Sequence, residues 1–365
     1  MDYMKTVLEI KELQKAIKEV NKVKKNKDFE LSEIIQVSSE GGHTYLIKDN
    51  LQTRIKKKIN SEVAENGSIG LDENTTKLLL KLKNDEITFL DEEIKTGTKT
   101  IKFVSQETIK REDLQEKNSS FEVSEKELLR MLEVNYTCAT DEARPILQGV
   151  CFKDNETCAL DGYRLCRRTT REYDFKGEFI LNNESIKILK SLLDKKKNSN
   201  IQVNIYDKFV IFSFNDIELT CNMMDGNFIN YNSIIPYDEK YNTLYINDIE
   251  EIMNSLTLIN EIKVVDKRGR KTQPIVMLSA DDEKKLILSS KGVSNSITDA
   301  MEKNSYTNHE SDICFNTKYL IESLKIQSQE KIYCTYKNKV SPMIISNIDD
   351  NVENIELILP VRMTK

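Results

Sequence analysis

The stretch Phe179-Ile180-Leu181-Asn182-Asn183-Glu184-Ser185-Ile186 decides how this chain folds. Phe179 and Leu181 flank one further residue, and Asn182 follows as a helix-capping residue. Ile186 and Leu189 then recur at the spacing of an apolar helix face. The side-chain oxygens of Asn, Asp and Ser accept hydrogen bonds from the free N–H groups in the first turn of a helix. The stretch therefore predicts a strand that ends near Asn182 and an amphipathic helix directly after it.

This strand-and-helix pattern occurs six times, at intervals of about sixty residues. A weak copy opens the chain at Val7-Leu8-Glu9. The other copies are Ile69-Gly70-Leu71-Asp72, Phe121-Glu122-Val123-Ser124, Leu244-Tyr245-Ile246-Asn247 and Ile313-Cys314-Phe315-Asn316. Ser124 with Glu127, and Asn247 with Glu250, also have the spacing of a capping box. Repetition on this scale predicts six similar units, with Asp72, Ser124, Asn182, Asn247 and Asn316 as helix caps.

The six units group in pairs, which predicts three tandem domains at residues 1–119, 120–240 and 241–365. A chain of 365 residues is too long for a single hydrophobic core. Both joints have the polar composition of linkers, at Lys117-Asn118-Ser119-Ser120 and at Pro236-Tyr237-Asp238-Glu239-Lys240. Pairing the units within a domain allows each helix to bury its apolar face.

Between the predicted helices, apolar residues recur with the period of two that is typical of half-buried strands. Ile201-Gln202-Val203-Asn204-Ile205 and residues 208–214 are the clearest cases. Asp154-Asn155 and Asp207-Lys208 have the composition of hairpin turns. The predicted fold class is therefore α+β, with one helix and several antiparallel strands in each unit.

The bulk composition indicates an ordinary globular chain, with 39% hydrophobic and 31% charged residues. No apolar run has the length of a membrane span, and no apolar leader opens the chain, so we expect a cytoplasmic protein. Seven cysteines without a C-x-x-C pair favour reduced, mostly buried thiols. The net charge of −6 argues against a free-standing DNA-binding protein, which usually carries a positive charge.

Signatures of catalysis are largely missing from the sequence. His43 and His309 are the only histidines, and we expect both at the surface without metal ligands nearby. Gly97-Thr98-Lys99-Thr100 lacks the first glycine of a phosphate-binding loop and predicts a hairpin turn. The basic run Lys267-Arg268-Gly269-Arg270-Lys271 favours a solvated loop. We therefore expect no enzyme, no cofactor and no metal site.

Basic residues recur on the predicted helices, opposite their apolar faces. Along the first helix, lysines follow one another at spacings of four, three and four residues: Lys11, Lys15, Lys18 and Lys22. A solvated face explains any single helix, but recurrence in most copies weakens that explanation. The fifth helix departs from the pattern, because Glu250 and Glu251 make it acidic.

Four further segments are more specific than the repeat. They are residues 141–150 around Arg144-Pro145, Ala159-Leu160-Asp161-Gly162-Tyr163-Arg164-Leu165, residues 224–231 followed by Pro236, and Ile358-Leu359-Pro360-Val361-Arg362-Met363. Together they resemble the corresponding motifs of the bacterial DNA polymerase III beta subunit, the sliding clamp. The resemblance covers the second and third predicted domains well, whereas the first matches mainly in length and helix placement.

The resemblance implies a DNA-clamp fold and a function. In that family two subunits close head to tail into a ring, with helices inside and strands outside, around double-stranded DNA. The ring is a non-catalytic processivity factor that a separate ATPase loads. Retention by topology requires only a weakly basic lining, whose phosphate contacts would carry no sequence information. The DNA-facing residues implied here are Lys11, Lys15, Lys18, Lys22, Lys77, Lys81, Arg130, Arg144, Lys187, Lys190, Lys318 and Lys325.

The resemblance also implies a docking cleft between the second and third domains. Polymerase, clamp loader and repair proteins of that family insert a short Gln-Leu-x-Leu-Phe-like peptide there. Its residues would be Leu147, Leu160, Gly162, Tyr163, Arg164, Leu165, Ile229, Ser233, Ile234, Val340, Pro342, Leu357, Leu359, Pro360, Val361, Arg362 and Met363. Leu160, Tyr163 and Ser233 depart from the residues usual in the family, so the preferred peptide is expected to differ.

Ring closure in the family joins the first domain of one subunit to the third domain of the other. The implied dimer-interface residues are Ile101, Phe103, Leu256, Leu258 and Ile259. An alternative function, kept open by the divergent first domain and the acidic fifth helix, is a clamp-like adaptor that binds peptides without encircling DNA. An enzyme that uses Asp161 and Arg164 is the least favoured hypothesis, because no nucleophile accompanies them.

Overall fold

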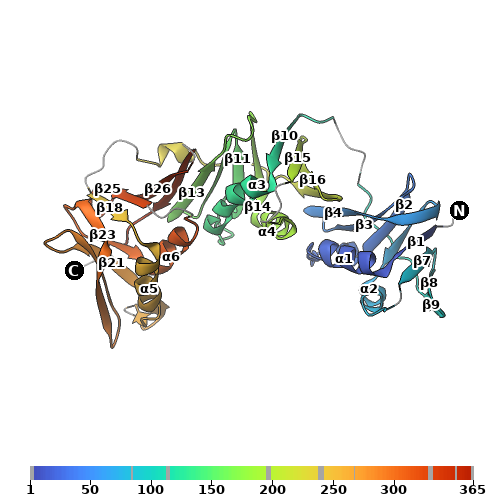
Figure 1. The fold of residues 1–365 in the computed structure, drawn as a ribbon, viewed down its shortest axis with the longest axis horizontal. Coiled ribbons are helices and arrows are strands. Elements are labelled where there is room, and N and C mark those ends of the chain that lie inside the picture. The colour runs from blue at the N-terminus through green and yellow to red at the C-terminus, as the bar shows by residue number, and fades with distance from the viewer. Residues whose placement is uncertain are drawn as a thin grey trace. The chain divides into compact units, whose positions relative to one another are not determined.

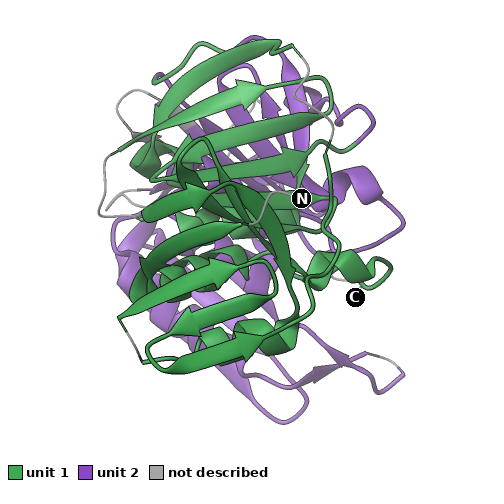
Figure 2. Cartoon of the chain, turned by 90° about the vertical axis from the view of Figure 1, so that its right-hand side faces the viewer, with its two compact units in different colours: residues 1–129, 172–175, 181–224 green, residues 130–171, 176–180, 225–365 purple. Residues whose placement is uncertain are grey.

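The structure is a computed structural model that describes residues 4–83, 85–111, 116–194, 199–236, 242–266, 268–327, 332–349 and 352–362. Its contacts divide the chain into two compact units (Figure 2). Unit 1 contains residues 1–129, 172–175 and 181–224, and unit 2 contains residues 130–171, 176–180 and 225–365. No helix within the described ranges is both long and apolar enough to cross a bilayer.

Unit 1 contains two antiparallel sheets. The smaller sheet has the order β5 (Ser61–Glu65), β1 (Lys5–Glu9), β7 (Glu86–Leu90), β8 (Glu93–Thr96) and β9 (Lys99–Lys102). The larger has the order β10 (Ser119–Ser124), β15 (Asn200–Ile205), β16 (Phe209–Phe214), β17 (Ile217–Asn222), β4 (Thr53–Ile59), β3 (His43–Asp49), β2 (Ile35–Glu40) and β6 (Gly67–Leu71). Helix α1 (Ile10–Val20) packs on β3 and β4, beside α2 (Glu73–Leu79) (Figure 1). Helix α4 (Asn183–Leu192) also belongs to this unit.

Unit 2 is built on one long antiparallel sheet, whose first strand ends in unit 1. Its order is β14 (Glu178–Asn182), β11 (Gly149–Lys153), β12 (Glu156–Leu160), β13 (Arg164–Thr169), β27 (Val352–Ile358), β26 (Met343–Asp349), β25 (Ile332–Tyr336), β18 (Asn242–Ile246), β23 (Ser296–Asn308), β22 (Lys285–Lys291), β21 (Ile275–Ala280) and β24 (Ile313–Asn316). A separate two-stranded sheet joins β19 (Val264–Val265) to β20 (Lys271–Thr272). Helices α5 (Ile249–Asn260) and α6 (Thr317–Lys325) lie side by side and share one apolar core with the strands (Figure 1). Helix α3 (Glu125–Met131) begins in unit 1 and ends in unit 2.

Short helices complete the chain. They are η1 (Glu30–Glu33) in unit 1, and η2 (Leu132–Thr137), η3 (Pro145–Gln148) and η4 (Tyr231–Ser233) in unit 2. The predicted α+β class and the predicted strand-to-helix pattern are confirmed, since at most two residues separate each of β1, β6, β10, β14, β18 and β24 from the helix that follows it. The predicted turns at Asp154-Asn155, Asp207-Lys208 and Gly97-Thr98 also join consecutive strands.

Most of the predicted helix caps are confirmed by side-chain hydrogen bonds. Asp72 accepts from the Thr75 N–H, Asn182 from the Glu184 N–H and Asn316 from the Lys318 N–H. Ser124 Oγ accepts from the Glu127 N–H at 3.2 Å.

The cap predicted at Asn247 is wrong by one residue. Asp248 caps α5 by accepting from the Glu251 N–H. The cause is a long-range contact, because the Asn304 side-chain oxygen accepts from the N–H groups of both Asn247 and Asp248 and holds them outside the helix.

Two strand pairs cross the predicted domain joints. β17 pairs with β4, from Ile217 with Lys57 to Cys221 with Thr53, and β13 pairs with β27, from Arg164 with Ile358 to Arg167 with Ile355. Each large sheet therefore contains strands from two predicted domains. This is why the chain divides into two compact units and not into the three predicted domains. Ser119 and Ser120, expected in a linker, already belong to β10, and the second joint lies mostly outside the described residues.

The cysteines agree with the sequence, whereas one of the histidines does not. Six of the seven thiols are buried and all are free. His43 is exposed as expected. The His309 side chain is only 17% exposed, because its ring packs at 4.6 Å on Tyr306 and its Nε2 lies 3.2 Å from Asp312.

Candidate docking site at the end of the long sheet

Three strand ends of unit 2 meet where the predicted cleft residues lie. β13 begins at Arg164, which pairs with Ile358 at the end of β27, and Ile358 in turn pairs with Met343 at the start of β26. The Leu359 N–H continues this register by donating to the Tyr163 carbonyl at 2.8 Å. The 161–163 turn, the 338–342 turn and the segment after β27 are thereby brought to one end of the sheet.

Large apolar side chains are exposed in these segments and on either side of η4, at 37–62% of their surface. They form what we call the apolar end surface, defined as Tyr163, Ile229, Ile234, Val340 and Leu359. Ile229 and Ile234 flank η4, which is held against β13 by a 3.1 Å hydrogen bond from Arg167 to the Asn232 side-chain oxygen. Exposed apolar residues gathered in this way are typical of a surface that binds another protein.

The other predicted cleft residues range from buried to exposed. Leu147, Leu160, Leu165 and Leu357 are buried in the core. Ser233 and Arg362 are exposed, Pro342, Pro360 and Val361 are half-buried, and Met363 lies outside the described residues. The Val361 N–H donates to the Cys314 carbonyl at 2.7 Å, which ties the segment after β27 to β24.

A cavity of about 460 Å³ opens beside Tyr163. Arg144, Gly162, Lys318 and Tyr319 are among its lining residues, and the Tyr163 and Tyr319 ring centroids are 6.4 Å apart. Gly162 has φ +89°, and a Cβ atom there would lie 2.7 Å from the Arg144 guanidinium. The positive φ therefore favours glycine in the turn, and a larger residue would also displace the end of the Arg144 side chain. The cavity size is within the usual range for ligand pockets.

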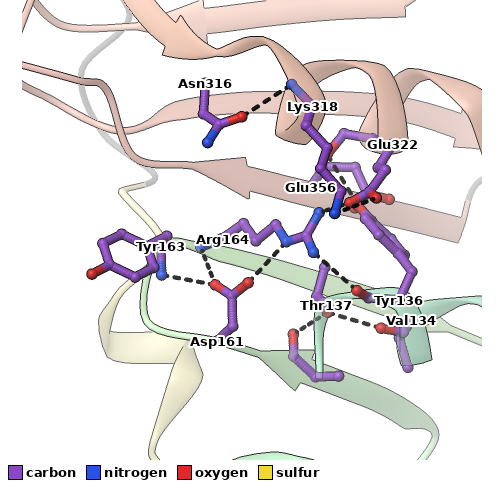
Figure 3. A network of polar contacts seen from close by, with 12 residues as sticks. Val134, Tyr136, Thr137, Asp161, Tyr163, Arg164, Asn316, Lys318, Glu322 and Glu356 are labelled. Atoms are coloured by element: carbon purple, nitrogen blue, oxygen red, sulfur yellow. Dashed lines mark hydrogen bonds and ion pairs between the residues drawn. The ribbon is translucent and has the colours of Figure 1, made fainter. Parts of the chain in front are cut away.

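Arg164 holds the wall of this cavity together (Figure 3). Its Nε donates to Asp161 at 3.0 Å, Nη2 donates to the Tyr136 carbonyl at 3.1 Å, and Nη1 donates to Glu322 of α6. Its guanidinium also lies 4.4 Å from the centre of the Tyr319 ring, at cation–π distance. Burial alone would lower the pKa of Arg164, but the hydrogen bond to Glu322 raises it. Because its guanidinium is occupied by these contacts, Arg164 stabilises the fold around the cavity.

Behind Arg164 a buried ion pair fixes β27 to β13. Glu356 is 1% and Arg168 is 3% exposed, and their Oε1 and Nη2 atoms are 2.6 Å apart. The Tyr136 hydroxyl donates to the other oxygen of Glu356 at 2.5 Å. Burial and the Glu356 charge raise the pKa of Tyr136 well above its ordinary value, so the hydroxyl stays a donor. This pair anchors the strand that leads directly to Leu359.

The sequence did not point to two residues of this site. Tyr319 and Glu322 come from α6, where Tyr319 reads as part of an amphipathic helix and Glu322 as part of its solvated face. Lys318 was expected to face DNA, and it also lines the cavity. The one available signal was the spacing Lys318 to Glu322, which allows an ion pair along a helix and is occupied at 3.9 Å.

The basic helix faces are exposed where the sequence placed them. Lys11, Lys15 and Lys18 lie on the exposed side of α1, opposite its buried apolar residues. Lys77, Lys81, Lys187, Lys318 and Lys325 are exposed, and Lys22 and Lys190 are half-buried. Arg144 is exposed on the cavity wall. Arg130 differs, because its guanidinium donates to the Asn354 side chain at 2.7 Å and to the Thr169 carbonyl.

The residues expected at a subunit interface divide between surface and core. β9 is the last strand of its sheet, with Ile101 and Phe103 half-buried and Val104 72% exposed. On α5, Leu258 is 62% exposed, whereas Leu256 and Ile259 are buried in the core of unit 2.

The paired strand-to-helix units and the sheets that cross both joints define a DNA-clamp fold, and solved structures agree. The chain superimposes on the DNA polymerase sliding clamp from Bacillus subtilis with a TM-score of 0.88 and 19% identity, over 99% of this chain and 100% of that one. A sliding clamp from Bartonella birtlesii, bound to griselimycin, gives 0.86 and 20% identity over 99% and 100%.

Sequence comparison identifies the family. Residues 122–230 match the central domain of the DNA polymerase III beta subunit, and residues 232–362 match its C-terminal domain. The chain belongs to the DNA polymerase III beta subunit family. It is 26% identical to the beta sliding clamp of Bacillus subtilis over 235 residues, which are 62% of this chain and span 60% of that relative's own length.

Proposed function

We propose that this chain is a homodimeric DNA sliding clamp, a non-catalytic protein that encircles duplex DNA and tethers a replicative polymerase to it. The cytoplasm, in association with the nucleoid, is the proposed location. The observation that carries the proposal is the apolar end surface. It lies at one end of the long sheet and contains residues from both of the matched domains. Family membership and the superposition along the whole chain support it.

The proposed division is into three domains, at residues 1–119, 120–240 and 241–365. The repeat supports it, because each of these segments contains two strand-to-helix units. The central-domain and C-terminal-domain matches begin at residues 122 and 232, close to the proposed joints. The strands that cross the joints would make the domains one continuous ring wall.

In the proposed ring, exposed lysines on α1, α2, α4 and α6 contact DNA phosphates. Lysine is suited to this role because its flexible charge reaches phosphates without selecting a base sequence. Arg130 is not part of the proposed lining, since Asn354 and Thr169 occupy its guanidinium. The net charge of −6 is compatible with the proposal because topology, not affinity, would hold the ring on DNA.

The test for encirclement compares DNA topologies. A cognate clamp loader and ATP would place the protein on nicked circular duplex, and gel filtration would then separate bound from free protein. We expect retention on the circle and loss after a restriction enzyme linearises it. Equal retention on both forms would mean ordinary binding, and a monomer at micromolar concentration would favour the peptide-binding adaptor instead.

At the apolar end surface we propose a docking site for short Gln-Leu-x-Leu-Phe-like peptides of polymerase, clamp loader and repair proteins. Aliphatic and aromatic anchors would pack on Tyr163 and Leu359, and the buried leucines among the predicted cleft residues would keep the site rigid. The cavity lined by Arg144 would accept polar groups next to the anchors.

Peptide binding can be measured by fluorescence anisotropy with a labelled Gln-Leu-x-Leu-Phe peptide. Leu359→Asp should weaken binding at least about tenfold, because it places a charge where an apolar anchor packs. Tyr333→Asp is a matched control, since Tyr333 is 38% exposed in unit 2, close to the 37% of Leu359, but lies on β25. Equal affinities of the two variants would show that the site is misplaced.

A further inference from the structure

A basic hairpin in unit 2 is not used by the function proposed so far. It consists of β19, β20 and the turn between them, of which Lys267 lies outside the described residues. Asp266 forms hydrogen bonds across the turn, because its side chain accepts from the Arg268 N–H at 2.8 Å and from Arg270 Nε at 2.9 Å. The backbone N–H of Arg270 lowers the pKa of Asp266, so the aspartate remains charged and holds the turn. Gly269 has φ +75°, which suits glycine.

This turn displays charges that the hairpin itself does not neutralise. Arg268 and Lys271 are exposed, and no acidic side chain within the described ranges forms an ion pair with either of them. Val265, 44% exposed, belongs to the same hairpin, and Val293, 66% exposed, is attached beside it by a 3.0 Å hydrogen bond from its N–H to the Lys263 carbonyl. We call Lys263, Val265, Arg268, Lys271 and Val293 the basic hairpin surface. Its mixture of cations and valines fits an acidic protein surface better than a phosphate backbone, which offers nothing apolar.

A complementary surface lies at the open edge of β9 in unit 1. The Phe103 N–H, just after β9, donates to the Glu92 carbonyl at 3.0 Å, which places this exposed glutamate beside Phe103. Val104 is the most exposed large apolar residue among those described, at 72%. Glu92 has no ion pair within the described part of the chain. The end of this edge therefore offers a free carboxylate together with apolar side chains.

The strand edges explain how these surfaces would meet in two copies of the chain. β22 pairs with residues 296–300 of β23 on one side, whereas β18 reaches β23 only at residues 305–308. The first half of β23 is thus open on its other edge within the described structure. If β9 of a second copy pairs antiparallel with this edge, its Phe103 end lies beside the start of β23. The turn before β23 contacts Lys263 and Ile262 through Gly292, so the basic hairpin stands at that same end.

We infer that the β19–β20 hairpin is an interprotomer arm that docks on Glu92 and Val104 of a second copy of this chain. The arm sets the register in which β9 and β23 pair and strengthens closure of the ring. This inference rests on the proposed clamp function, because it needs a dimer. Opposite charges at a subunit rim mainly guide association and select the correct register.

The test measures the dimer dissociation constant by sedimentation velocity of the full chain at low and high salt. Arg268→Glu with Lys271→Glu should raise the dimer dissociation constant about 25-fold at low salt. A closed ring contains two such contacts, and each should contribute a factor of about five. The effect should shrink at high salt. Adding Glu92→Lys to the double variant should restore most of the affinity, because it reverses the charge on the other side. Lys208→Glu with Lys339→Glu makes the same charge change on two other hairpin turns and should have no effect.

The outcomes separate the inference from the proposed function. A wild-type monomer would remove both. A wild-type dimer whose dissociation constant is unchanged in the Arg268→Glu, Lys271→Glu variant would overturn the arm and leave the ring intact. An unchanged dimer with weakened binding to duplex DNA would instead assign the hairpin to nucleic acid, and failed rescue by Glu92→Lys would refute the pairing proposed here.

Discussion

Replacing Glu356 by glutamine tests whether the buried ion pair anchors the docking site. The change keeps the size of the side chain but removes its charge, so the 3% exposed guanidinium of Arg168 loses its main counter-charge. Glu133, whose Oε2 lies 3.9 Å from Arg168 Nε and whose side chain is 36% exposed, is a weaker counter-charge. The new amide group would also face the Tyr136 hydroxyl, which now donates to this position. The amide keeps one acceptor oxygen, so one of the two present donors, Arg168 or Tyr136, would lose its hydrogen-bond acceptor.

The expected cost is about 3–5 kcal/mol of unfolding free energy, the usual loss when one member of a buried ion pair is removed. Urea unfolding followed by circular dichroism would measure it. The double variant Arg168→Met, Glu356→Leu should recover most of the loss, since replacing both partners with apolar residues leaves no buried charge. Glu283→Gln is the matched control, because Glu283 is 75% exposed in the same unit and should change stability by at most about 0.5 kcal/mol.

The same substitution should also affect binding of the docking peptide. β27 leads directly into Leu359, so a loosened strand should weaken binding of the Gln-Leu-x-Leu-Phe-like peptide even though Glu356 is buried. A loss below about 1 kcal/mol in Glu356→Gln, or a double variant as unstable as the single one, would refute the assignment of Glu356 as an anchor.

Three further predictions concern other parts of the chain. Asp72→Ala should cost about 1 kcal/mol in urea unfolding because it removes the cap of α2, whereas Glu9→Ala, at the start of a helix without a side-chain cap bond, should cost almost nothing. Gly162→Ala should cost about 1–3 kcal/mol, since it puts a side chain at φ +89° and displaces Arg144; unchanged stability and peptide affinity would contradict this. Burial raises the pKa of Cys334 from its usual value near 9.0 to about 12. Between these two pH values only the unfolded chain loses the thiol proton, so the free energy of unfolding should fall by about 1.4 kcal/mol per pH unit. Cys334→Ala should show a smaller fall between pH 9 and pH 11 than the wild type, and equal falls would exclude this thiol as the cause.

Features set by neighbours along the chain could be predicted from the sequence. Asp72, Asn182 and Asn316 cap helices because capping depends on residues two or three positions away. The shift from Asn247 to Asp248 escaped prediction because Asn304, on a distant strand, determines it. The sequence also did not show which of Leu256, Leu258 and Ile259 is exposed. Packing alone decides which apolar residues of α5 face the core.

The candidate site was predictable only through its motifs. Hydrophobic periodicity predicts individual strands, such as residues 201–205, but carries no information on strand pairing, and the pairing of β13 with β27 joins segments about 190 residues apart. The positions of Tyr319 and Glu322 follow from that pairing, because it brings α6 against the 161–163 turn. The resemblance supplied the missing long-range contact for Leu359 and Tyr163, and it supplied none for α6.

The pairing of β13 with β27 also determines the order in which the chain can fold. During synthesis β13 emerges long before its partner, and at about 5–20 residues per second its edge waits for about 10–40 seconds. An open strand edge over that time can pair with another nascent chain, so this protein should depend on chaperones during translation. Variants that end before β27 should accumulate in inclusion bodies, even though the first large sheet, from β10 to β6, would already be complete.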